Sequence, residues 1–254
     1  MSDELKRYWD ENGLDAVVEA GLAMEREMEK REGAVSDETT LPPDVSDLAR
    51  LHRIIRTRRC FTVLEFGTGF STLVMAHALM LNKRDFEALP EKPRLRNSRL
   101  FQLFTVDTSE YWMQRSQSRM PEELAALCTF SHSGCTIGTY NGQLCHYYDR
   151  IPNVIADFIY LDGPDPEEVK GDVHGLDFSI LERTVMSGDL LLMESTFLPG
   201  TFILVDGRTN NCRFLARNFQ RNYKIEHDAQ GDVTTFELDE ARLGKLNILG
   251  SDLF

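Results

Sequence analysis

Val63-Leu-Glu-Phe-Gly-Thr-Gly-Phe-Ser-Thr72 combines a short apolar strand, a sharp turn and the start of a helix. The strand covers residues 61–64, Glu65 stands at its end, Gly67 and Gly69 form the turn, and the helix is predicted to open at Ser71. Glycine has no Cβ, so the backbone can turn tightly and approach a ligand closely. The free N–H groups of the new helix face the same place. The stretch predicts an α/β fold with a ligand site here; an ordinary strand-to-helix turn is the alternative.

The length and composition of the chain fit one α/β domain with a helical extension. It has 254 residues, of which 42% are hydrophobic and 9% aromatic, which is enough to bury a core. No apolar run approaches the roughly 20 residues that span a bilayer, and the polar N-terminus is unlike a secretory signal. The five cysteines lie at irregular spacing without a C-x-x-C pair, which fits reduced thiols and disfavours zinc. We therefore expect a cytoplasmic protein without a membrane partner.

Most of the negative charge lies near the N-terminus. Residues 1–47 hold 14 acids and 5 bases, so they contribute −9 of the net −13. An acidic surface repels polyphosphate, so we expect no nucleic acid partner. Apolar residues recur among the charges over residues 3–33, which predicts amphipathic helices broken near Asn12-Gly13. We expect an acidic helical extension over residues 1–44, with a possible homo-oligomer contact through these helices, and one domain over residues 45–254.

Three later segments also run from an apolar strand into an acid. They are Leu100–Asp107, Asp157–Asp162 and Thr201–Asp206. Residues 189–194 compete for the last strand, but 201–206 has the sharp lead-in Leu198-Pro-Gly200 and a following crossover helix. The carboxyl ends of parallel strands line one crevice of a doubly wound sheet. We therefore expect acids from several strand ends to converge with the glycine turn.

Other segments complete the predicted secondary structure. Ser46 is expected to cap a helix that ends in the basic run at residues 56–59. Asn141-Gly142 predicts a two-residue hairpin turn, and residues 223–238 predict a closing hairpin around Gly231. The insertion at residues 82–99 has six bases and three acids; we expect a solvated loop, with contact to an anionic substrate group as the alternative.

The order of these elements resembles the class I S-adenosylmethionine-dependent methyltransferases over roughly residues 45–240. Residues 63–69 are similar to the first cofactor motif of that family in its E-x-G-x-G form. Tyr160-Leu-Asp-Gly-Pro164 resembles the fourth motif of small-molecule and sugar O-methyltransferases, and Leu204-Val-Asp-Gly-Arg208 resembles a segment of uncharacterised bacterial members. The resemblance implies a doubly wound Rossmann-like α/β sheet, mostly parallel, with an antiparallel strand near the C-terminus.

The resemblance also implies S-adenosylmethionine as the cofactor. Asp107 would hold the ribose hydroxyls, with Thr108 beside it, and Asp162 would border the same pocket. His132, at the end of the expected third strand, could touch an adenine, although a structural role is the alternative. The methionine and ribose side of the cofactor would be lined by Glu65, Gly67, Thr68, Gly69 and Ser71.

The implied reaction is methyl transfer to a hydroxyl of a small molecule or sugar. Asp162 or His174 is the expected base, His174 lying in an acid-rich loop predicted to overhang the crevice. Asp162 and Asp206 could instead hold Mg²⁺, but Gly207 stands where metal-dependent relatives commonly carry an amide or acid ligand. Arg208 could anchor an anionic acceptor, or form an ion pair with a crevice acid.

Two alternatives stay open at this stage, and a third is disfavoured. The acceptor could be an amine or a protein side chain, which the motifs do not exclude. The chain could also be a non-catalytic cofactor-binding scaffold that acts through its acidic helical arm. A nicotinamide-dependent oxidoreductase would require a third glycine where the chain has Thr72, so it is disfavoured.

Overall fold

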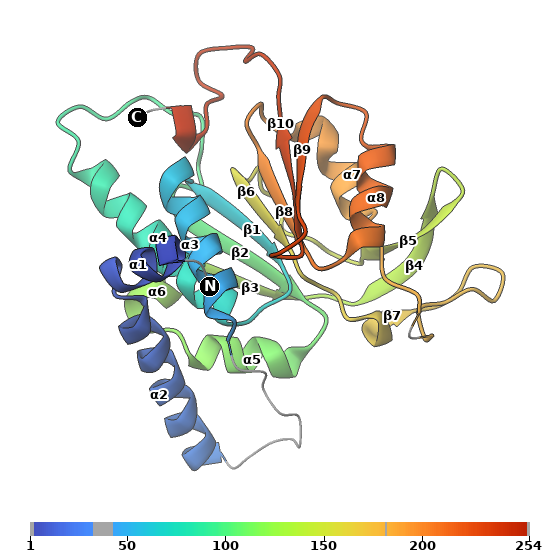
Figure 1. The fold of residues 1–254 in the computed structure, drawn as a ribbon, viewed down its shortest axis with the longest axis horizontal. Helices are drawn as coiled ribbons and strands as arrows, with labels where there is room; N and C mark the ends of the chain where they lie inside the picture. Colours follow the sequence, from blue (N-terminus) through green and yellow to red (C-terminus); the bar gives the residue numbers. More distant parts are fainter. Residues whose placement is uncertain (1–2, 33–42, 181, 253–254) are drawn as a thin grey trace.

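A seven-stranded sheet forms the centre of the computed structural model, which describes residues 3–32, 43–180 and 182–252 (Figure 1). Its strand order is β3-β2-β1-β6-β8-β10-β9. The first five strands are parallel, and β10 is antiparallel to both β8 and β9. The strands are β1 (Thr62–Phe66), β2 (Gln102–Asp107), β3 (Cys128–His132), β6 (Phe158–Leu161), β8 (Phe202–Asp206), β9 (Tyr223–Asp228) and β10 (Val233–Leu238). The predicted fold class is therefore confirmed.

Helices cover both faces of this sheet. Every residue of β1 is buried, as expected for a central parallel strand. Leu64 and Phe66 point to the face covered by α7 (Asp189–Met193) and α8 (Thr209–Asn218). Val63 belongs to the core formed with α3 (Val45–Arg58) and α4 (Phe70–Glu87) on the other face. The side-chain alternation of the strand thus builds two cores, one on each side.

Two N-terminal helices pack on the outer side of the α3 and α4 layer, the first against α3 and the second against α4. They are α1 (Asp3–Glu11) and α2 (Leu14–Glu32), and Gly13 between them has φ +62°, which confirms the predicted break. Trp9 and Leu14 are buried against Leu73 of α4. The predicted linker that follows lies largely outside the described residues. Among the residues that are described, no helix is long and apolar enough to cross a membrane.

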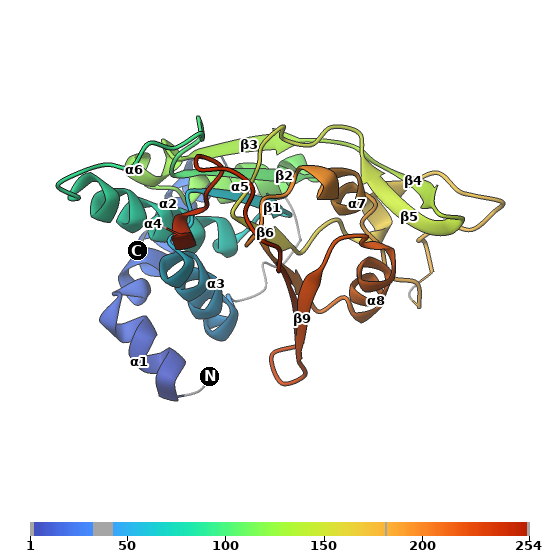
Figure 2. The same cartoon turned by 90° about the horizontal axis from the view of Figure 1, so that it is seen from above.

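A small second sheet extends from the side of the molecule opposite the N-terminal helices (Figures 1 and 2). Its order is β5-β4-β7, with the predicted hairpin turn at Asn141-Gly142, where φ is 49° and 72°. The remaining elements are β4 (Cys135–Tyr140), β5 (Gln143–Tyr148), β7 (Val169–Lys170), α5 (Glu110–Ser118), α6 (Glu122–Ala125) and the single turns η1 (Pro166–Glu168), η2 (Glu194–Thr196) and η3 (Gly250–Asp252).

Local predictions fail where a neighbouring residue takes the expected role. The carboxylate of Asp44, rather than Ser46, caps α3, because it accepts a hydrogen bond from the backbone N–H of Ser46 at 2.7 Å.

Residues 189–193 form a helix and 202–206 form the strand, so the preference between those two segments is confirmed.

The basic insertion lies at the end of the sheet away from the strand-end acids. α4 continues to Glu87, so the first third of the predicted loop is helical. The rest of the loop packs where β1 begins, since Asn97 Nδ2 donates to Thr62 Oγ1 at 3.1 Å and Thr62 Oγ1 donates to the Arg99 carbonyl at 3.0 Å. Contact between this insertion and a substrate at the strand-end site is therefore excluded.

Candidate active site

The glycine turn after β1 brings three strand ends together. Gly67 has φ +103°, a conformation that side chains other than glycine rarely adopt. Its N–H donates to the Val106 carbonyl of β2 at 2.9 Å, and the Asp162 N–H, just after β6, donates to the Phe66 carbonyl at 3.0 Å. A Cβ on Gly163 would stand 2.9 Å from the Gly67 nitrogen. Glycine at both positions therefore permits this close backbone contact.

Glu65 lies under the turn and not in the crevice. Its side chain is fully buried, and it accepts hydrogen bonds from the hydroxyls of Ser71 and Thr72, the second at 2.7 Å. Burial raises the pKa of Glu65 to about 8. The structure therefore corrects the expectation that Glu65 lines a cofactor pocket, because its carboxyl fastens the first turn of α4 to β1.

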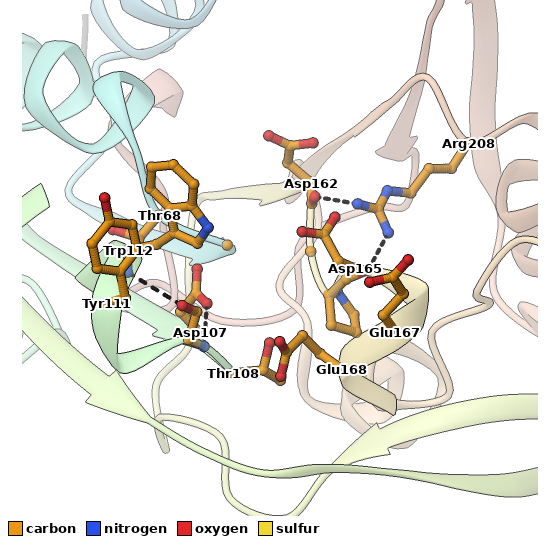
Figure 3. Close-up of a pocket in the computed structure, with 14 residues that line it drawn as sticks. Thr68, Asp107, Thr108, Tyr111, Trp112, Asp162, Asp165, Glu167, Glu168 and Arg208 are labelled. Atoms are coloured by element: carbon orange, nitrogen blue, oxygen red, sulfur yellow. Dashed lines mark hydrogen bonds between the residues drawn. The ribbon is translucent and has the colours of Figure 1, made fainter. Parts of the chain in front are cut away.

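A cavity of about 660 Å³ opens at the carboxyl ends of β1, β2, β6 and β8 (Figure 3). Trp112, Asp107 and Thr68 stand on one side and face Asp162 and Arg208 on the other (Figure 3). We call this space the large cavity. It is lined by Gly67, Thr68, Asp107, Thr108, Ser109, Tyr111, Trp112, Asp162, Gly163, Pro164, Asp165, Glu167, Glu168 and Arg208.

Asp107 presents a carboxylate to the large cavity from the end of β2. One of its oxygens accepts the Ser109 N–H at 2.7 Å, which fixes the side chain at the start of α5. Burial raises the pKa of Asp107 to about 6. His132 is exposed and does not line this cavity; its Nε2 lies 3.1 Å from the backbone carbonyl of Thr108, which does line it.

A second cavity, of about 420 Å³, adjoins the first. We call it the small cavity. The two share Thr68, Trp112 and Asp162 in their walls. The rest of the small cavity is lined by Pro43, Asp44, Asp47, Leu48, Leu51, Gly69, Phe70, Ser71, Arg119, Tyr160 and Asp206. Gly69 and Ser71, both expected near the cofactor, therefore lie at this second space.

Asp162 stands where the two cavities meet. Burial among protein atoms, together with the nearby Asp206 carboxylate, raises the pKa of Asp162 to about 7. Asp206 accepts a hydrogen bond from the buried Tyr160 hydroxyl at 2.9 Å, and burial raises the pKa of Asp206 as well. A carboxyl group that titrates near neutral pH beside an open cavity is suited to accept a proton.

Arg208 and His174 take positions other than those expected. The Arg208 guanidinium donates to the carbonyls of Pro164, at 2.6 Å, and Asp162, so it clamps the loop after β6. It therefore neither forms the expected ion pair nor presents those two nitrogens to an acceptor. His174 is at the exposed tip of a turn that Asp172 closes by accepting the Gly175 N–H at 2.7 Å. It lines neither cavity, so the structure does not place it as a base.

The donor set around Asp162 and Asp206 does not fit a metal ion. Over residues 3–32, 43–180 and 182–252, no group of three or more His, Cys, Asp or Glu side chains is arranged to hold one. Gly207 supplies no side-chain ligand, and Asp206 is already bonded to Tyr160. The suggested magnesium site is therefore not supported.

Residues absent from the sequence prediction form much of the large cavity. Tyr111 and Trp112 occupy the first turn of α5, directly after Asp107, and Asp165, Glu167 and Glu168 follow β6 in the same way. Only their position in the sequence could have indicated these residues, because each group follows shortly after an acid at the end of a strand. The turn that follows a parallel strand faces the same crevice as the strand end itself.

Several solved structures that are similar to this chain are methyltransferases. The O-methyltransferase TomG of Streptomyces achromogenes, involved in tomaymycin synthesis and solved with SAM, is 16% identical, with 88% of this chain and 90% of TomG covered and a TM-score of 0.47. A Geobacter sulfurreducens methyltransferase is 14% identical (94% and 98% covered, TM-score 0.47), and a Bacillus cereus O-methyltransferase solved with SAH is 12% identical (87% and 90% covered, TM-score 0.41). No family model and no curated protein matches the chain. At such low identity these similarities concern the fold, so the activity is inferred from this chain's own site.

Proposed function

We propose that this chain is an S-adenosylmethionine-dependent methyltransferase that acts on a hydroxyl of a small molecule, such as a sugar or a phenol. The observation that carries the proposal is the pair of adjoining cavities with Asp162 at their junction. One cavity is large enough for a nucleoside cofactor, since ligand sites commonly measure about 300–1,000 Å³. The other provides a separate space for an acceptor within reach of the same carboxylate.

The large cavity fits the chemistry of S-adenosylmethionine. Asp107 can accept hydrogen bonds from both ribose hydroxyls, because its fixed side chain opens onto the cavity. Gly67 and Thr68 bring backbone close to the ligand. Five carboxylates line the space against one guanidinium, whose bonds go to carbonyl oxygens. This negative lining complements a ligand that carries a sulfonium and an ammonium group.

The same turn is poorly suited to a dinucleotide diphosphate. The Gly69 N–H donates to Thr72 Oγ1 at 3.1 Å, so it is not free for a phosphate oxygen. Thr72 in turn donates to the Glu65 carboxyl. A helix N-terminus that binds phosphate needs free N–H groups. Thr72 stands where a dinucleotide-binding motif has its third glycine, and its hydroxyl already accepts the Gly69 N–H that a phosphate would need. This arrangement favours the methyltransferase over the oxidoreductase.

The proposed mechanism uses the protein for orientation and proton transfer. S-adenosylmethionine supplies a methyl carbon made electrophilic by a positively charged sulfur. Tyr111 and Trp112, which line the large cavity, would shield the bound cofactor from water, and the small cavity would hold and orient the acceptor. Asp162 would accept the hydroxyl proton as the acceptor oxygen takes the methyl group and the carbon–sulfur bond breaks, which leaves S-adenosylhomocysteine. Burial, together with the Asp206 carboxylate that Tyr160 holds, keeps the pKa of Asp162 raised.

An amine-bearing acceptor is the second candidate. Four aspartates line the small cavity, and its one cation, Arg119, is paired with Glu25. An amine-bearing acceptor would therefore be attracted as its ammonium form and would give a proton to Asp162 before its nitrogen took the methyl group, whereas a carboxylate or phosphate would be repelled. This charge favours neutral or cationic acceptors and disfavours the anionic acceptor first expected for Arg208.

The test is methyl transfer from radiolabelled S-adenosylmethionine to a panel of sugars, phenols and amines, with and without EDTA. We expect transfer to at least one hydroxyl-bearing acceptor, at the same rate in both conditions. Transfer restricted to amines would support the second candidate. Tight cofactor binding without transfer to any panel member would instead favour the non-catalytic scaffold.

A further inference from the structure

Glu25 of the N-terminal helix α2 is buried in a cluster of charged residues that reaches the wall of both cavities. Its side chain is 4% exposed, and it accepts hydrogen bonds from Arg115 Nε at 2.6 Å and from Arg119 Nε and Nη2 at 2.8 and 2.9 Å. Burial of a carboxylate is costly unless it is paired. The two guanidiniums more than offset that cost and lower the pKa of Glu25, although burial acts to raise it.

Both arginines belong to the α5 region, which carries the aromatic wall. Arg115 donates to the Tyr111 hydroxyl at 2.6 Å, and its guanidinium carbon lies 5.9 Å from the centre of the Trp112 ring. Arg119, 2% exposed, stacks 4.1 Å over the ring of Phe70 at the start of α4. The single carboxylate of Glu25 therefore bridges the helical arm to the residues that form the walls of the large and small cavities.

α5 is also fixed to the glycine turn. Ser116 Oγ donates to the Gly69 carbonyl at 3.1 Å, and Ser109 caps the helix. The arm also packs closely, because a Cβ on Gly21 would stand 3.2 Å from the Arg119 carbonyl and 2.7 Å from the Leu73 side chain. α5 is thus held between the turn and the arm, and Glu25 is the charged contact on the arm side.

We propose that Glu25 is a positioning residue, which sets α5 so that Tyr111 and Trp112 form the wall of the cofactor cavity. The acidic arm is then part of the active site and not only a helical cap. This inference rests on the proposed function for the identity of the ligand. On this inference cofactor affinity depends also on Glu25, a residue that is distant in sequence from every strand-end motif.

The test uses the full chain with variants that keep the buried charges balanced. In Glu25→Asp the carboxylate withdraws by one methylene, and in Arg115→Lys the cation can no longer bridge Glu25, Glu29 and Tyr111. Glu27→Asp and Arg26→Lys, on the exposed side of α2, are the matched controls. Two quantities are measured for each: the Kd for S-adenosylhomocysteine by calorimetry, and the quenching of tryptophan fluorescence by acrylamide.

Quenching by acrylamide measures how exposed Trp112 is in the wall of the large cavity. The chain has two tryptophans; Trp9 is 3% exposed, so quenching comes mainly from Trp112. We expect both test variants to raise the Kd about tenfold, to increase quenching, and to keep the wild-type thermal midpoint within a few degrees. The controls are expected to match the wild type.

Two outcomes overturn the proposal. One is a folded Glu25→Asp and a folded Arg115→Lys that bind S-adenosylhomocysteine within twofold of the wild type with unchanged quenching. The other is a loss of affinity that appears only in proportion to the unfolded fraction, which assigns Glu25 a purely structural role. If the wild type itself fails to bind S-adenosylhomocysteine, the proposed function fails, and a change in Trp112 quenching still tests the contact between Glu25 and α5.

Discussion

Asp162 is the residue that the chemistry depends on most. It lies at the junction of the two cavities, and its pKa is raised to about 7 by burial and by Asp206. A base must be ionised to accept a proton, so we expect kcat/KM for the acceptor to fall as pH decreases below about 7 and to level off above it. Kinetics from pH 5.5 to 8.5 with saturating cofactor measure this profile.

The Asp162→Asn variant tests the same residue by removal. We expect kcat to decrease by about 10²–10⁴-fold, the usual contribution of a general base, and the Kd for S-adenosylhomocysteine to stay within about threefold. A variant with wild-type kcat and an unchanged pH profile would show that the proton goes elsewhere.

Glu65 gives a prediction about stability. Its pKa is raised from 4.5 to about 8 by burial, so the folded state binds more protons than the unfolded state between those pH values, and stability decreases as pH rises through that range. Glu65→Gln removes this titration. We expect its thermal midpoint to change less than that of the wild type between pH 5 and 8.

The comparison of the two pH series by calorimetry is the measurement. Each kcal/mol corresponds to a shift of roughly 2–4 °C in the midpoint of a chain of this size. Equal pH dependence in the variant and the wild type would mean that Glu65 keeps an ordinary pKa in the folded protein.

Side-chain alternation explains why Glu65 was expected in the crevice. The sequence shows an acid at the end of a strand, but not which face of the sheet it occupies. Glu65 shares the face of Val63, toward α3 and α4, and the hydroxyls of Ser71 and Thr72 meet it there. Ser71 and Thr72, two hydroxyl residues in the first turn of the next helix, were the only feature of the sequence that could have indicated a partner for the Glu65 carboxyl.

At the scale of elements, strand ends were predictable and long loops were not. An apolar run that stops at an acid fixes a parallel strand and its carboxyl end, which placed Asp107, Asp162 and Asp206 correctly at one edge of the sheet. The position of His174 depends on how the loop after η1 folds, and the position of residues 82–99 depends on contacts at the start of β1. Such long-range contacts leave no local pattern in the sequence.

The β2–α5 connection gives a prediction at this scale. Asp107→Ala removes the carboxylate proposed to hold the ribose, so we expect the Kd for S-adenosylhomocysteine to rise by about 10–100-fold, as for one or two charge-assisted hydrogen bonds. His132→Ala and His174→Ala, outside the cavities, serve as controls with wild-type affinity. A larger loss in His174→Ala than in Asp107→Ala would contradict the assignment of the site.

At the scale of the molecule, the site is negatively charged, as is the chain as a whole. The net charge is −13, and the walls of the two cavities carry many more carboxylates than free cations. We expect a phenol that carries an amine, such as tyramine, to have a kcat/KM at least tenfold higher than 4-hydroxyphenylacetate, which has a carboxylate in the corresponding position.

Ionic strength provides the control for this preference. Salt screens charge interactions, with a Debye length of about 10 Å at 0.1 M, so the ratio between the two acceptors should decrease as salt is added. A preference for the carboxylate compound at every salt concentration would overturn the assignment of acceptor charge.

The homo-oligomer contact through the N-terminal helices stays a prediction, which analytical ultracentrifugation can test.

The most direct test of the central claim is calorimetric titration of the purified chain with S-adenosylhomocysteine, with NAD⁺ titrated in parallel. We expect one site per chain with a micromolar Kd for S-adenosylhomocysteine, weakened in Asp107→Ala, and no binding of NAD⁺. Absence of S-adenosylhomocysteine binding at millimolar concentration, or tighter binding of NAD⁺, would contradict the assignment of the large cavity to a methyltransferase cofactor.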